Sequence, residues 1–264
     1  MYFAALVPTS AGVPSPERAN LAVNIMISVV VPVRNEAENI IPLIEEIHAT
    51  LEGRWDFEVI YVDDGSSDET KARLGDAGAR FGRLKVLRHR ASCGQSAAIW
   101  TGVKAAQGTW IVTLDGDGQN DPADIPALLE IAEAADPGAP LDLVAGIRRK
   151  RRDSWLKRAS SRIANGARSW LLADNVTDTG CGLKVIRRET YLALPYFDHM
   201  HRYLPALILR SGGRLECVDV NHRPRHSGRS NYATLDRLGV GIADLMGVMW
   251  LKRRNKIPII ESEE

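Results

Sequence analysis

Two aspartates, Asp115 and Asp117, are separated by one glycine and follow an apolar run at residues 110–114. Such a run predicts a buried strand, so both carboxylates stand at its end. A turn that starts at Gly116 would let both carboxylates reach one ion. Hard cations such as Mg²⁺ prefer oxygen ligands and commonly bridge one or two carboxylates to phosphates. Because Asp-Gly is also a frequent turn dipeptide, the spacing predicts either a divalent metal site or a plain surface turn.

The elements that would position these carboxylates alternate between strand and helix. Apolar, β-branched runs predict strands at residues 25–33, 57–62, 84–87, 109–114 and 141–145. One-sided apolar spacing predicts a helix at 37–51 that stops at Gly53, and another helix follows at 94–106. Ser67 or Asp68 can cap a helix after the second strand. This alternation predicts an α/β layer sandwich with a mostly parallel sheet, whose ligands lie beyond the carboxyl ends of the strands.

A second acidic pair, Asp63 and Asp64, directly follows the predicted strand at 57–62. It would therefore line the same crevice as Asp115 and Asp117. No Gly-x-Gly-x-x-Gly motif follows a strand, and no Gly-Lys-Ser or Gly-Lys-Thr P-loop is present. The sequence thus argues against dinucleotide and Walker-type phosphate sites.

Composition places the chain among ordinary globular proteins. It has 264 residues, 45% hydrophobic and 25% charged, with a formal net charge of +1. Three cysteines, an odd number without metal or redox spacing, favour a reducing compartment. Residues 1–24 lack the basic start of a signal peptide, so they are interpreted as a flexible extension or as the result of a start codon placed upstream of Met26. No run of about 18 apolar residues predicts a bilayer span.

Four motifs occur in a fixed order along the chain. They are residues 31–36 (VPVRNE), 62–68 (VDDGSSD), 94–96 (GQS) and 115–119 (DGDGQ). Their order and spacing resemble those of family 2 glycosyltransferases with the GT-A fold, and most of all the dolichol-phosphate mannosyltransferase group, which includes bacterial enzymes that load sugars onto undecaprenyl phosphate. The resemblance covers residues 26–254. It implies a GT-A domain at 25–232, followed by an amphipathic helix and charged tail at 233–264.

This resemblance implies a nucleotide-sugar site built from the four motifs. Asp115 and Asp117 would hold Mg²⁺ or Mn²⁺, and Asp63 or Asp64 would bind the base or ribose, since a carboxylate accepts paired hydrogen bonds. The alternative for Asp63 and Asp64 is a helix-capping acidic turn. The residues expected to contact the donor are Pro32, Arg34, Glu36, Asp63, Asp64, Gln95, Gly116, Gln119 and Ser230.

The segment at residues 222–232 resembles the family's flexible loop over the donor diphosphate. Arg225 and Arg229 would stabilise the departing nucleoside diphosphate, because the planar guanidinium binds phosphate oxygens in pairs. The family commonly has lysine where Asn231 stands, so Arg229 would have to supply that charge. The alternative is a basic, solvated loop.

The segment at 177–182 (TDTGCG) stands where the family usually has Asp-Pro-Thr-Ser-Gly-Phe, before a predicted strand at 183–186. Cys181 departs from that pattern. We interpret Cys181 as a small buried residue and not as a nucleophile, because no histidine lies near it in the sequence. Its replacement by serine should preserve activity.

Basic residues crowd between Arg148 and Arg168, with Asp153 as the single acid in that segment. Such a run favours an anionic partner. The alternatives are a solvated helix face and nucleic acid, but the interleaved apolar residues favour a membrane surface, with tryptophan at headgroup depth. These are Trp155, Leu156, Ile163, Trp170 and Leu171. The residues expected to grip a polyprenyl phosphate are Arg148, Arg158, Ser161 and Arg162.

The stretch at 238–251 is apolar and is followed by Lys252, Arg253, Arg254 and Lys256. It predicts either a membrane-surface helix or a helix packed on the domain or in a dimer interface. A homo-oligomer and a separate membrane partner both remain open.

The expected function is inverting transfer of one sugar from a UDP- or GDP-sugar to a polyprenyl phosphate, at the cytoplasmic face of the membrane by peripheral attachment. The lipid phosphate arrives ionised, so a strong general base is less necessary than for a hydroxyl acceptor. Two alternatives remain. One is a glycosyltransferase acting on a soluble or polysaccharide hydroxyl, and the other, from a different class, is a basic nucleic-acid-binding protein. The resemblance favours the enzyme and no nucleic-acid partner.

Overall fold

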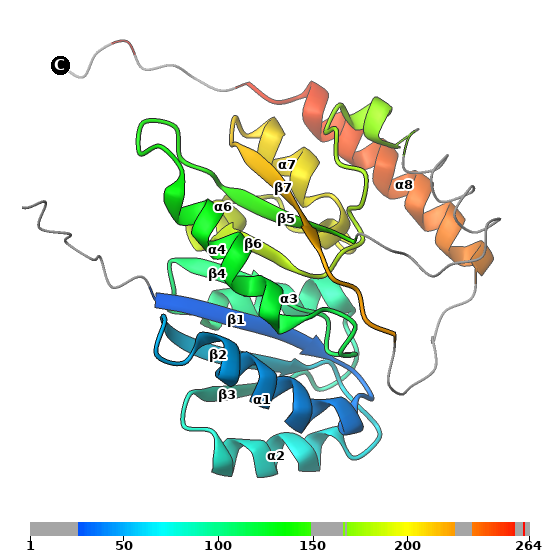
Figure 1. The fold of residues 1–264 in the computed structure, drawn as a ribbon. Helices are drawn as coiled ribbons and strands as arrows, with labels where there is room; N and C mark the ends of the chain where they lie inside the picture. The colour runs from blue at the N-terminus through cyan, green and yellow to red at the C-terminus, as the bar shows by residue number, and fades with distance from the viewer. Residues whose placement is uncertain (1–25, 149–165, 167, 225–233, 257–260, 262–264) are drawn as a thin grey trace, which may run out of the picture.

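The computed structural model of the chain describes residues 26–148, 166, 168–224, 234–256 and 261. The expectations for residues 1–24 lie outside this part of the chain. A seven-stranded sheet forms the centre of the molecule (Figure 1). Its strands are β1 Met26–Val33, β2 Asp56–Asp63, β3 Leu84–Arg88, β4 Trp110–Thr113, β5 Leu143–Arg148, β6 Lys184–Arg187 and β7 Leu215–Val220.

The sheet has the strand order β3-β2-β1-β4-β6-β5-β7. Only β6 among these strands pairs in antiparallel fashion, with β4 on one side and β5 on the other. The other pairs are parallel. The mostly parallel α/β sheet expected from the sequence is therefore confirmed.

Helices cover both faces of the sheet. The α-helices are α1 Ile40–Leu51, α2 Thr70–Arg80, α3 Gln95–Ala105, α4 Ile125–Ala134, α6 Arg188–Ala193, α7 Leu204–Arg210 and α8 Thr234–Arg253. Short 3-10 turns occur at η1 Ala37–Asn39, η2 Pro122–Asp124 and η3 Met200–Arg202. The helix expected at 37–51 thus begins as η1 and continues as α1, and it ends before Gly53, whose φ of 74° suits a glycine.

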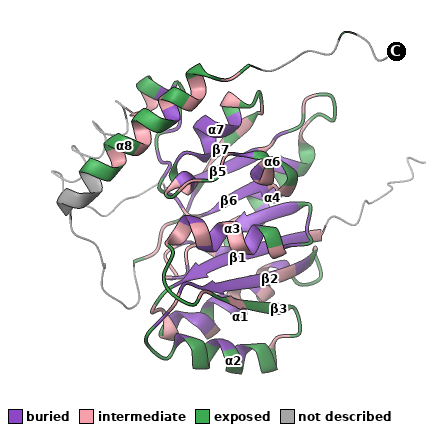
Figure 2. Cartoon of the chain, turned by 180° about the vertical axis from the view of Figure 1, so that it is seen from behind, coloured by how far each residue is buried: buried purple, intermediate pink, exposed green. Residues whose placement is uncertain are grey.

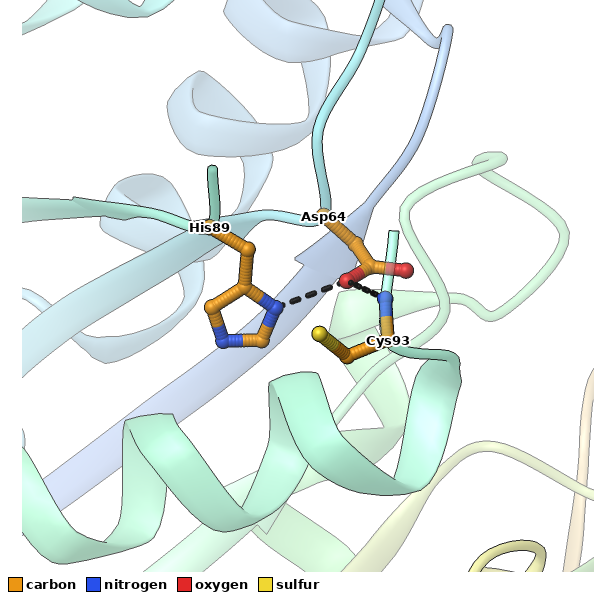
Figure 3. Close-up of side chains that lie close together, drawn as sticks. All are labelled: Asp64, His89 and Cys93. Atoms are coloured by element: carbon orange, nitrogen blue, oxygen red, sulfur yellow. Dashed lines mark hydrogen bonds and ion pairs between the residues drawn. The ribbon is translucent and has the colours of Figure 1, made fainter. Parts of the chain in front are cut away.

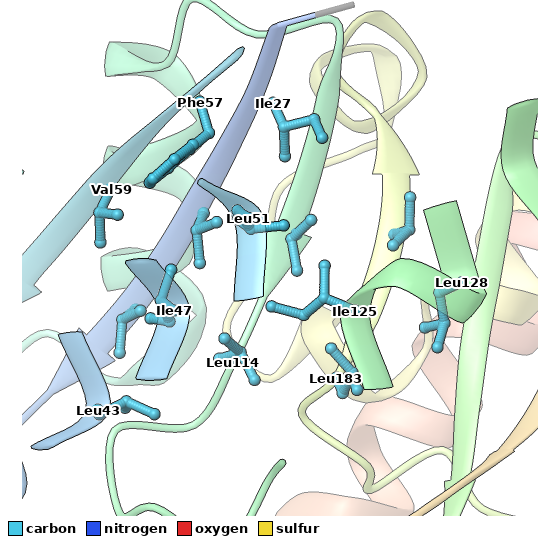
Figure 4. Packing of buried hydrophobic residues seen from close by; sticks show 14 of the residues in the cluster. Ile27, Leu43, Ile47, Leu51, Phe57, Val59, Leu114, Ile125, Leu128 and Leu183 are labelled. Carbon is cyan, nitrogen blue, oxygen red and sulfur yellow. The ribbon is translucent and has the colours of Figure 1, made fainter. Parts of the chain in front are cut away.

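Two hydrophobic layers flank the sheet because its central strands are buried on both faces. On one side α1, α2 and α4 pack against alternate residues of β1 such as Val29; Figure 4 shows part of this layer, with Ile47 and Ile125 pointing toward Leu114. On the other side α3, α6, α7 and Val248 of α8 pack around Val30. This double burial explains why the strands appear in the sequence as continuous apolar runs.

The parallel strands end at one edge, and this brings distant motifs together. Val33, the last residue of β1, pairs in register with Asp63, the last residue of β2. The amide N–H groups of Asp64 and Leu114 donate to the carbonyl oxygens of Val33 and Val30. The loops that follow β1, β2 and β4 therefore start side by side.

Helix α8 docks at the far end of the sheet from β3, beside α7 (Figure 1). Val248 is its buried contact, and Tyr203 Oη donates to the Gly241 carbonyl oxygen. Its opposite side is exposed to solvent, as Figure 2 shows. Among the described residues, no helix combines the length and the apolar character that crossing a bilayer requires.

Candidate functional site

A pocket of about 230 Å³ opens where the loops after β1, β2 and β4 meet the start of α3. Residues from all four sequence motifs line it. They are Pro32, Val33, Arg34, Glu36, Asp64, Gln95, Ala98, Asp115, Gly116 and Asp117. We call this cavity the donor-side pocket. Among the described residues that were expected to contact a donor, all but Asp63 and Gln119 line this pocket.

Asp115 is held by two hydrogen bonds of different kinds. Its Oδ1 accepts from Gln95 Nε2 at 2.8 Å, and its own amide N–H donates to Oδ1 of the buried Asn120 at 3.0 Å. Burial, followed by the neighbouring charge of Asp117, raises the pKa of the Asp115 carboxyl. Two carboxylates that repel each other in this way fit a divalent cation, because the cation relieves both the desolvation and the repulsion.

Three glycines near Asp115 are required for different physical reasons. The positive φ of the loop is at Gly118 (72°), whereas Gly116 is absent from the positive-φ residues. Gly116 is needed for space, since a Cβ there would lie 2.3 Å from Val33 Cγ1. A third glycine, Gly182, faces the carboxylate of Asp115, and a Cβ at Gly182 would lie 2.3 Å from it. The turn expected to start at Gly116 is present at Gly116 and Asp117. Packing against Val33 is what requires a glycine at position 116, and the positive φ lies at Gly118.

Asp63 and Asp64 are buried and hydrogen-bonded within the chain. Asp63 is 1% exposed, and its carboxylate accepts from the Ser66 amide and from Arg88 Nη1 at 2.8 and 2.7 Å. The Asp64 carboxylate accepts from four groups, namely His89 Nδ1, Ser92 Oγ and the amides of Cys93 and Gly94. Burial alone would raise the pKa of Asp64, but these hydrogen bonds together lower it.

The contacts of Asp64 define a cluster that sequence spacing did not reveal. Ligand atoms of Asp64, His89 and Cys93 lie within 4.8 Å of one another (Figure 3). His89 Nε2 also meets Thr101 Oγ1 at 2.9 Å, so both ring nitrogens already have partners. A carboxylate offers about four lone-pair sites. Those of Asp64 are occupied by these four donors, so the arrangement holds the loop before α3 in place. The pair Asp115 and Asp117 stays the predicted metal site.

A second pocket of about 710 Å³ lies on the other side of Asp115, beneath α8. We call it the acceptor-side pocket. It shares Asp115 and Gln95 with the donor-side pocket. Its lining includes Ile99, Thr113, Leu114, Gln119, Arg148, Arg168, Asp178, Thr179, Gly180, Cys181, Gly182, Lys184, His201, Arg202, Tyr203, Leu204, Gly241, Ile242 and Leu245. Gln119, expected on the donor, therefore lies in the second cavity beside the first.

Two arginines of the acceptor-side pocket are already paired with carboxylates. Arg148 Nε and Nη2 donate to the two oxygens of Asp178, each at 2.7 Å. Arg168 donates likewise to Asp174, at 2.6 and 3.4 Å. Of the four residues expected to grip the lipid phosphate, only Arg148 is described. Arg158, Ser161 and Arg162 lie outside the described residues, as do Arg225, Arg229 and Ser230 of the 222–232 loop.

Two further polar residues of this pocket, Lys184 and His201, were not predicted from the sequence. Lys184 on β6 is only 4% exposed, which is unusual for a lysine. His201 Nδ1 meets the Oγ of buried Ser96 at 2.7 Å, across 105 positions of sequence. Burial, then the nearby charge of Arg202, lowers the pKa of His201 well below its usual 6.5, so the ring is neutral. The signal for Lys184 was a single cation inside the apolar run at 183–186.

Cys181 is fully buried, belongs to one of the hydrophobic core clusters and lines the acceptor-side pocket. Burial raises the pKa of its thiol, so the reactive thiolate is disfavoured. A Cβ on Gly146 would lie 3.1 Å from its sulfur. The expectation that Cys181 is a small buried residue agrees with this position.

Comparison with known proteins identifies the family of the chain. The model of the family "Glycosyl transferase family 2" matches residues 28–193. The dodecaprenyl-phosphate galacturonate synthase of Rhizobium johnstonii is 34% identical over 88% of this chain and 69% of its own length. The undecaprenyl-phosphate 4-deoxy-4-formamido-L-arabinose transferase of Edwardsiella ictaluri is 34% identical. The match covers 79% of this chain and 63% of that relative's length.

Solved structures share the fold at lower sequence identity. Glucosyl-3-phosphoglycerate synthase from Mycobacterium tuberculosis, in complex with Mn²⁺, UDP and glucosyl-3-phosphoglycerate, superposes with a TM-score of 0.65 at 22% identity, covering 86% of this chain and 80% of that one. Mannosyl-3-phosphoglycerate synthase from Rubrobacter xylanophilus gives 0.69 at 18% identity, covering 92% and 80%. With its family model, its relatives and its sheet in agreement, this chain belongs to glycosyl transferase family 2.

Proposed function

We propose that the protein transfers one sugar from a nucleoside diphosphate sugar to a polyprenyl phosphate, with inversion at the anomeric carbon. The observation that carries this proposal is the meeting of two pockets at one carboxylate. Asp115 belongs to both the donor-side and the acceptor-side pocket. Two substrates bound in these cavities would therefore have their reacting ends near Asp115. The named relatives, which act on polyprenyl phosphates, support the choice of acceptor.

On the donor side, the chain's own groups would orient the nucleotide sugar. Pro32, Arg34 and Glu36 border the pocket, and Arg34 is the cation among them. Asp63 and Asp64 would act by fixing the loops around the nucleotide. Gln95, which donates to Asp115, holds that carboxylate toward the pocket. A rigid frame of this kind lowers the entropy cost of aligning two substrates.

A divalent metal, Mg²⁺ or Mn²⁺, would be held by Asp115 and Asp117. When bound, such an ion neutralises charge that develops on a departing diphosphate. Arg225 and Arg229 stay proposed partners of the same diphosphate.

On the acceptor side, no strong general base is required, because a phosphate monoester is largely ionised near neutral pH. The phosphate oxygen would attack the anomeric carbon, forming the new C–O bond as the bond to the nucleoside diphosphate breaks. Membrane attachment at the cytoplasmic face is part of the proposal. The exposed side of α8 and Trp170, which is 80% exposed, support it.

The proposal is tested by incubating the purified protein with Mg²⁺ or Mn²⁺, undecaprenyl phosphate and a panel of radiolabelled nucleotide sugars. Products are then partitioned between butanol and water. We expect label to enter butanol only when metal, lipid and one donor are all present. Nucleoside diphosphate release with unlabelled butanol would contradict the choice of acceptor, and no turnover of any donor would contradict the activity itself.

A second candidate is transfer to a soluble or polysaccharide hydroxyl. Such a reaction needs a base, and the neutral ring of His201 lines the acceptor-side pocket. In the same partition experiment, with hydroxyl acceptors added, this function would leave the labelled product in water.

A further inference from the structure

Lys184 is a buried cation at the floor of the acceptor-side pocket. It lies on β6 opposite Thr113 of β4, in the middle of the sheet. Its side chain is 4% exposed, yet it lines the cavity. Among the described residues, its ammonium donates one hydrogen bond, to the carbonyl oxygen of Cys181. A lysine ammonium has three donors, so this one retains capacity for a ligand.

The other cations of the pocket are less available. Arg148 and Arg168 are each engaged by a carboxylate with bidentate hydrogen bonds. Arg202 is exposed at the rim. The carboxylates whose charges act on Lys184 are Asp115 and Asp178, and Asp178 is the partner of Arg148. If a metal ion takes up the charge of Asp115, the Lys184 ammonium is left with an unbalanced positive charge next to open space. A buried unbalanced charge is costly, and an anion relieves it.

The rest of the pocket has the character of a hydrocarbon site. Ile99 of α3, Leu204 of α7 and Ile242 with Leu245 of α8 contribute apolar walls. Ile242 is also 53% exposed on the outer surface of α8. It therefore connects the cavity to the exposed apolar side of that helix. A ligand with an anionic head and an apolar tail matches this arrangement, with the head at Lys184 and the tail leaving past Ile242.

We propose that Lys184 binds the phosphate group of an isoprenyl phosphate whose first hydrocarbon units lie against α7 and α8. This inference rests on the proposed function, which it deepens by naming the residue that receives the acceptor's phosphate. Lys184 then takes the role that the basic run at 148–168 predicted for Arg148, whose guanidinium is instead paired with Asp178. A bound phosphate at Lys184 lies next to Asp115, where the two pockets meet.

The test compares Lys184→Met with Lys85→Met. Lys85 is a matched control because its ammonium also donates to a backbone carbonyl, that of Ala105 at 3.0 Å, but on exposed β3. The probes are citronellyl phosphate, a short isoprenyl phosphate, for direct binding by calorimetry, and undecaprenyl phosphate in detergent for the transfer assay. Methionine matches the length of lysine without its charge, and a thermal melt verifies that each variant folds.

We expect Lys184→Met to weaken citronellyl phosphate binding and to raise KM for undecaprenyl phosphate, each by about tenfold or more, as for loss of a hydrogen-bonded charge. KM for the nucleotide sugar and the metal requirement should be unchanged, Lys184→Arg should recover part of the affinity, and Lys85→Met should behave as wild type. Unchanged acceptor affinity would overturn the inference. So would tighter metal binding as the main effect, because Lys184 would then only balance the charge of Asp115.

The arms of the experiment also separate this inference from the proposed function. If the wild type binds citronellyl phosphate through Lys184 but transfers no sugar, the proposed function fails and the Lys184 site stands. If the wild type transfers sugar to undecaprenyl phosphate and Lys184→Met binds that acceptor normally, the proposed function stands and the Lys184 site fails. Inorganic phosphate serves as the competitor. Competition as strong as that of the isoprenyl phosphate would overturn the lipid assignment in favour of a free-phosphate site.

Discussion

At the scale of single residues, the two carboxylates after β4 have the clearest chemical consequence. Replacing Asp115 or Asp117 by Asn removes negative charge from the proposed metal site. We expect metal-dependent turnover to fall by about a hundredfold or more, equivalent to about 2.7 kcal/mol of transition-state stabilisation. The measurement is the rate of donor turnover against metal concentration.

Asp136→Asn is the control for this change, because Asp136 is an exposed acid that accepts a hydrogen bond from the Gly138 amide, in the turn between α4 and β5. It should leave the rate unchanged. A rate close to wild type in either Asp115→Asn or Asp117→Asn would refute the metal site.

The glycine that faces the Asp115 carboxylate, Gly182, should matter almost as much. A Cβ at Gly182 would lie 2.3 Å from the Asp115 carboxylate, so Gly182→Ala must displace that group. We expect turnover at saturating donor to fall by about tenfold or more, with the fold retained. The matched control is Gly78→Ala in α2, where a Cβ meets nothing within 4 Å. That control should keep full activity and gain about 0.5 kcal/mol in the free energy of unfolding. Equal activity in both variants would contradict the role of Gly182.

At the scale of elements, sequence periodicity predicted what depends on local pattern. The apolar runs of β1, β2 and β4 are long because these strands are buried on both faces, so their ends and the convergence of the motifs after them could be predicted. Strand β7 (LECVDV) was missed because its burial is partial and its polar residues interrupt the run. Contacts between distant elements, such as Ser96 with His201, leave no mark on local spacing. Lys184 illustrates the same limit, since the apolar run at 183–186 marks a strand but does not show that β6 lies between β4 and β5.

Helix α8 carries a stripe of exposed apolar residues at every fourth position. Ile242, Met246 and Trp250 are 53, 66 and 59% exposed, and Lys252 and Arg253 follow in the last turn. Positions four apart share one face of a helix. An apolar stripe beside basic residues fits the surface of an anionic bilayer.

We expect replacement of all three stripe residues by Ser to reduce binding to phosphatidylglycerol-containing vesicles by about tenfold or more, since each apolar side chain contributes to insertion. Sedimentation with vesicles measures this. Val86→Ser is the control, because Val86 is 40% exposed on β3, at the opposite edge of the sheet. Vesicle binding that survives in the triple variant would exclude α8 as the docking element.

At the scale of the whole molecule, the sheet, α3 and α8 build two adjoining cavities around Asp115. The groups that hold the frame are buried and hydrogen-bonded, and several are titratable. Asp64 keeps the loop before α3 in place with its carboxylate ionised, and His201 links η3 to Ser96 of α3 with its ring neutral. The same burial that orders the site therefore makes the stability of the fold depend on pH.

His201 allows this coupling to be measured. Its folded-state pKa lies well below the unfolded value of about 6.5, so its contribution to stability is complete above pH 6.5. As pH falls below that value, the unfolded chain binds a proton that the folded ring does not. The free energy of unfolding then declines by up to about 1.4 kcal/mol per pH unit until the folded-state pKa is reached. His201→Asn keeps an acceptor near Ser96. It should reduce the slope of the free energy of unfolding against pH, between about pH 6.5 and 5, by up to the contribution of one bound proton. Urea unfolding over a pH series measures the slope. His48, whose pKa burial also lowers, contributes equally to both proteins, so identical slopes in wild type and variant would show that His201 is not held neutral by the fold.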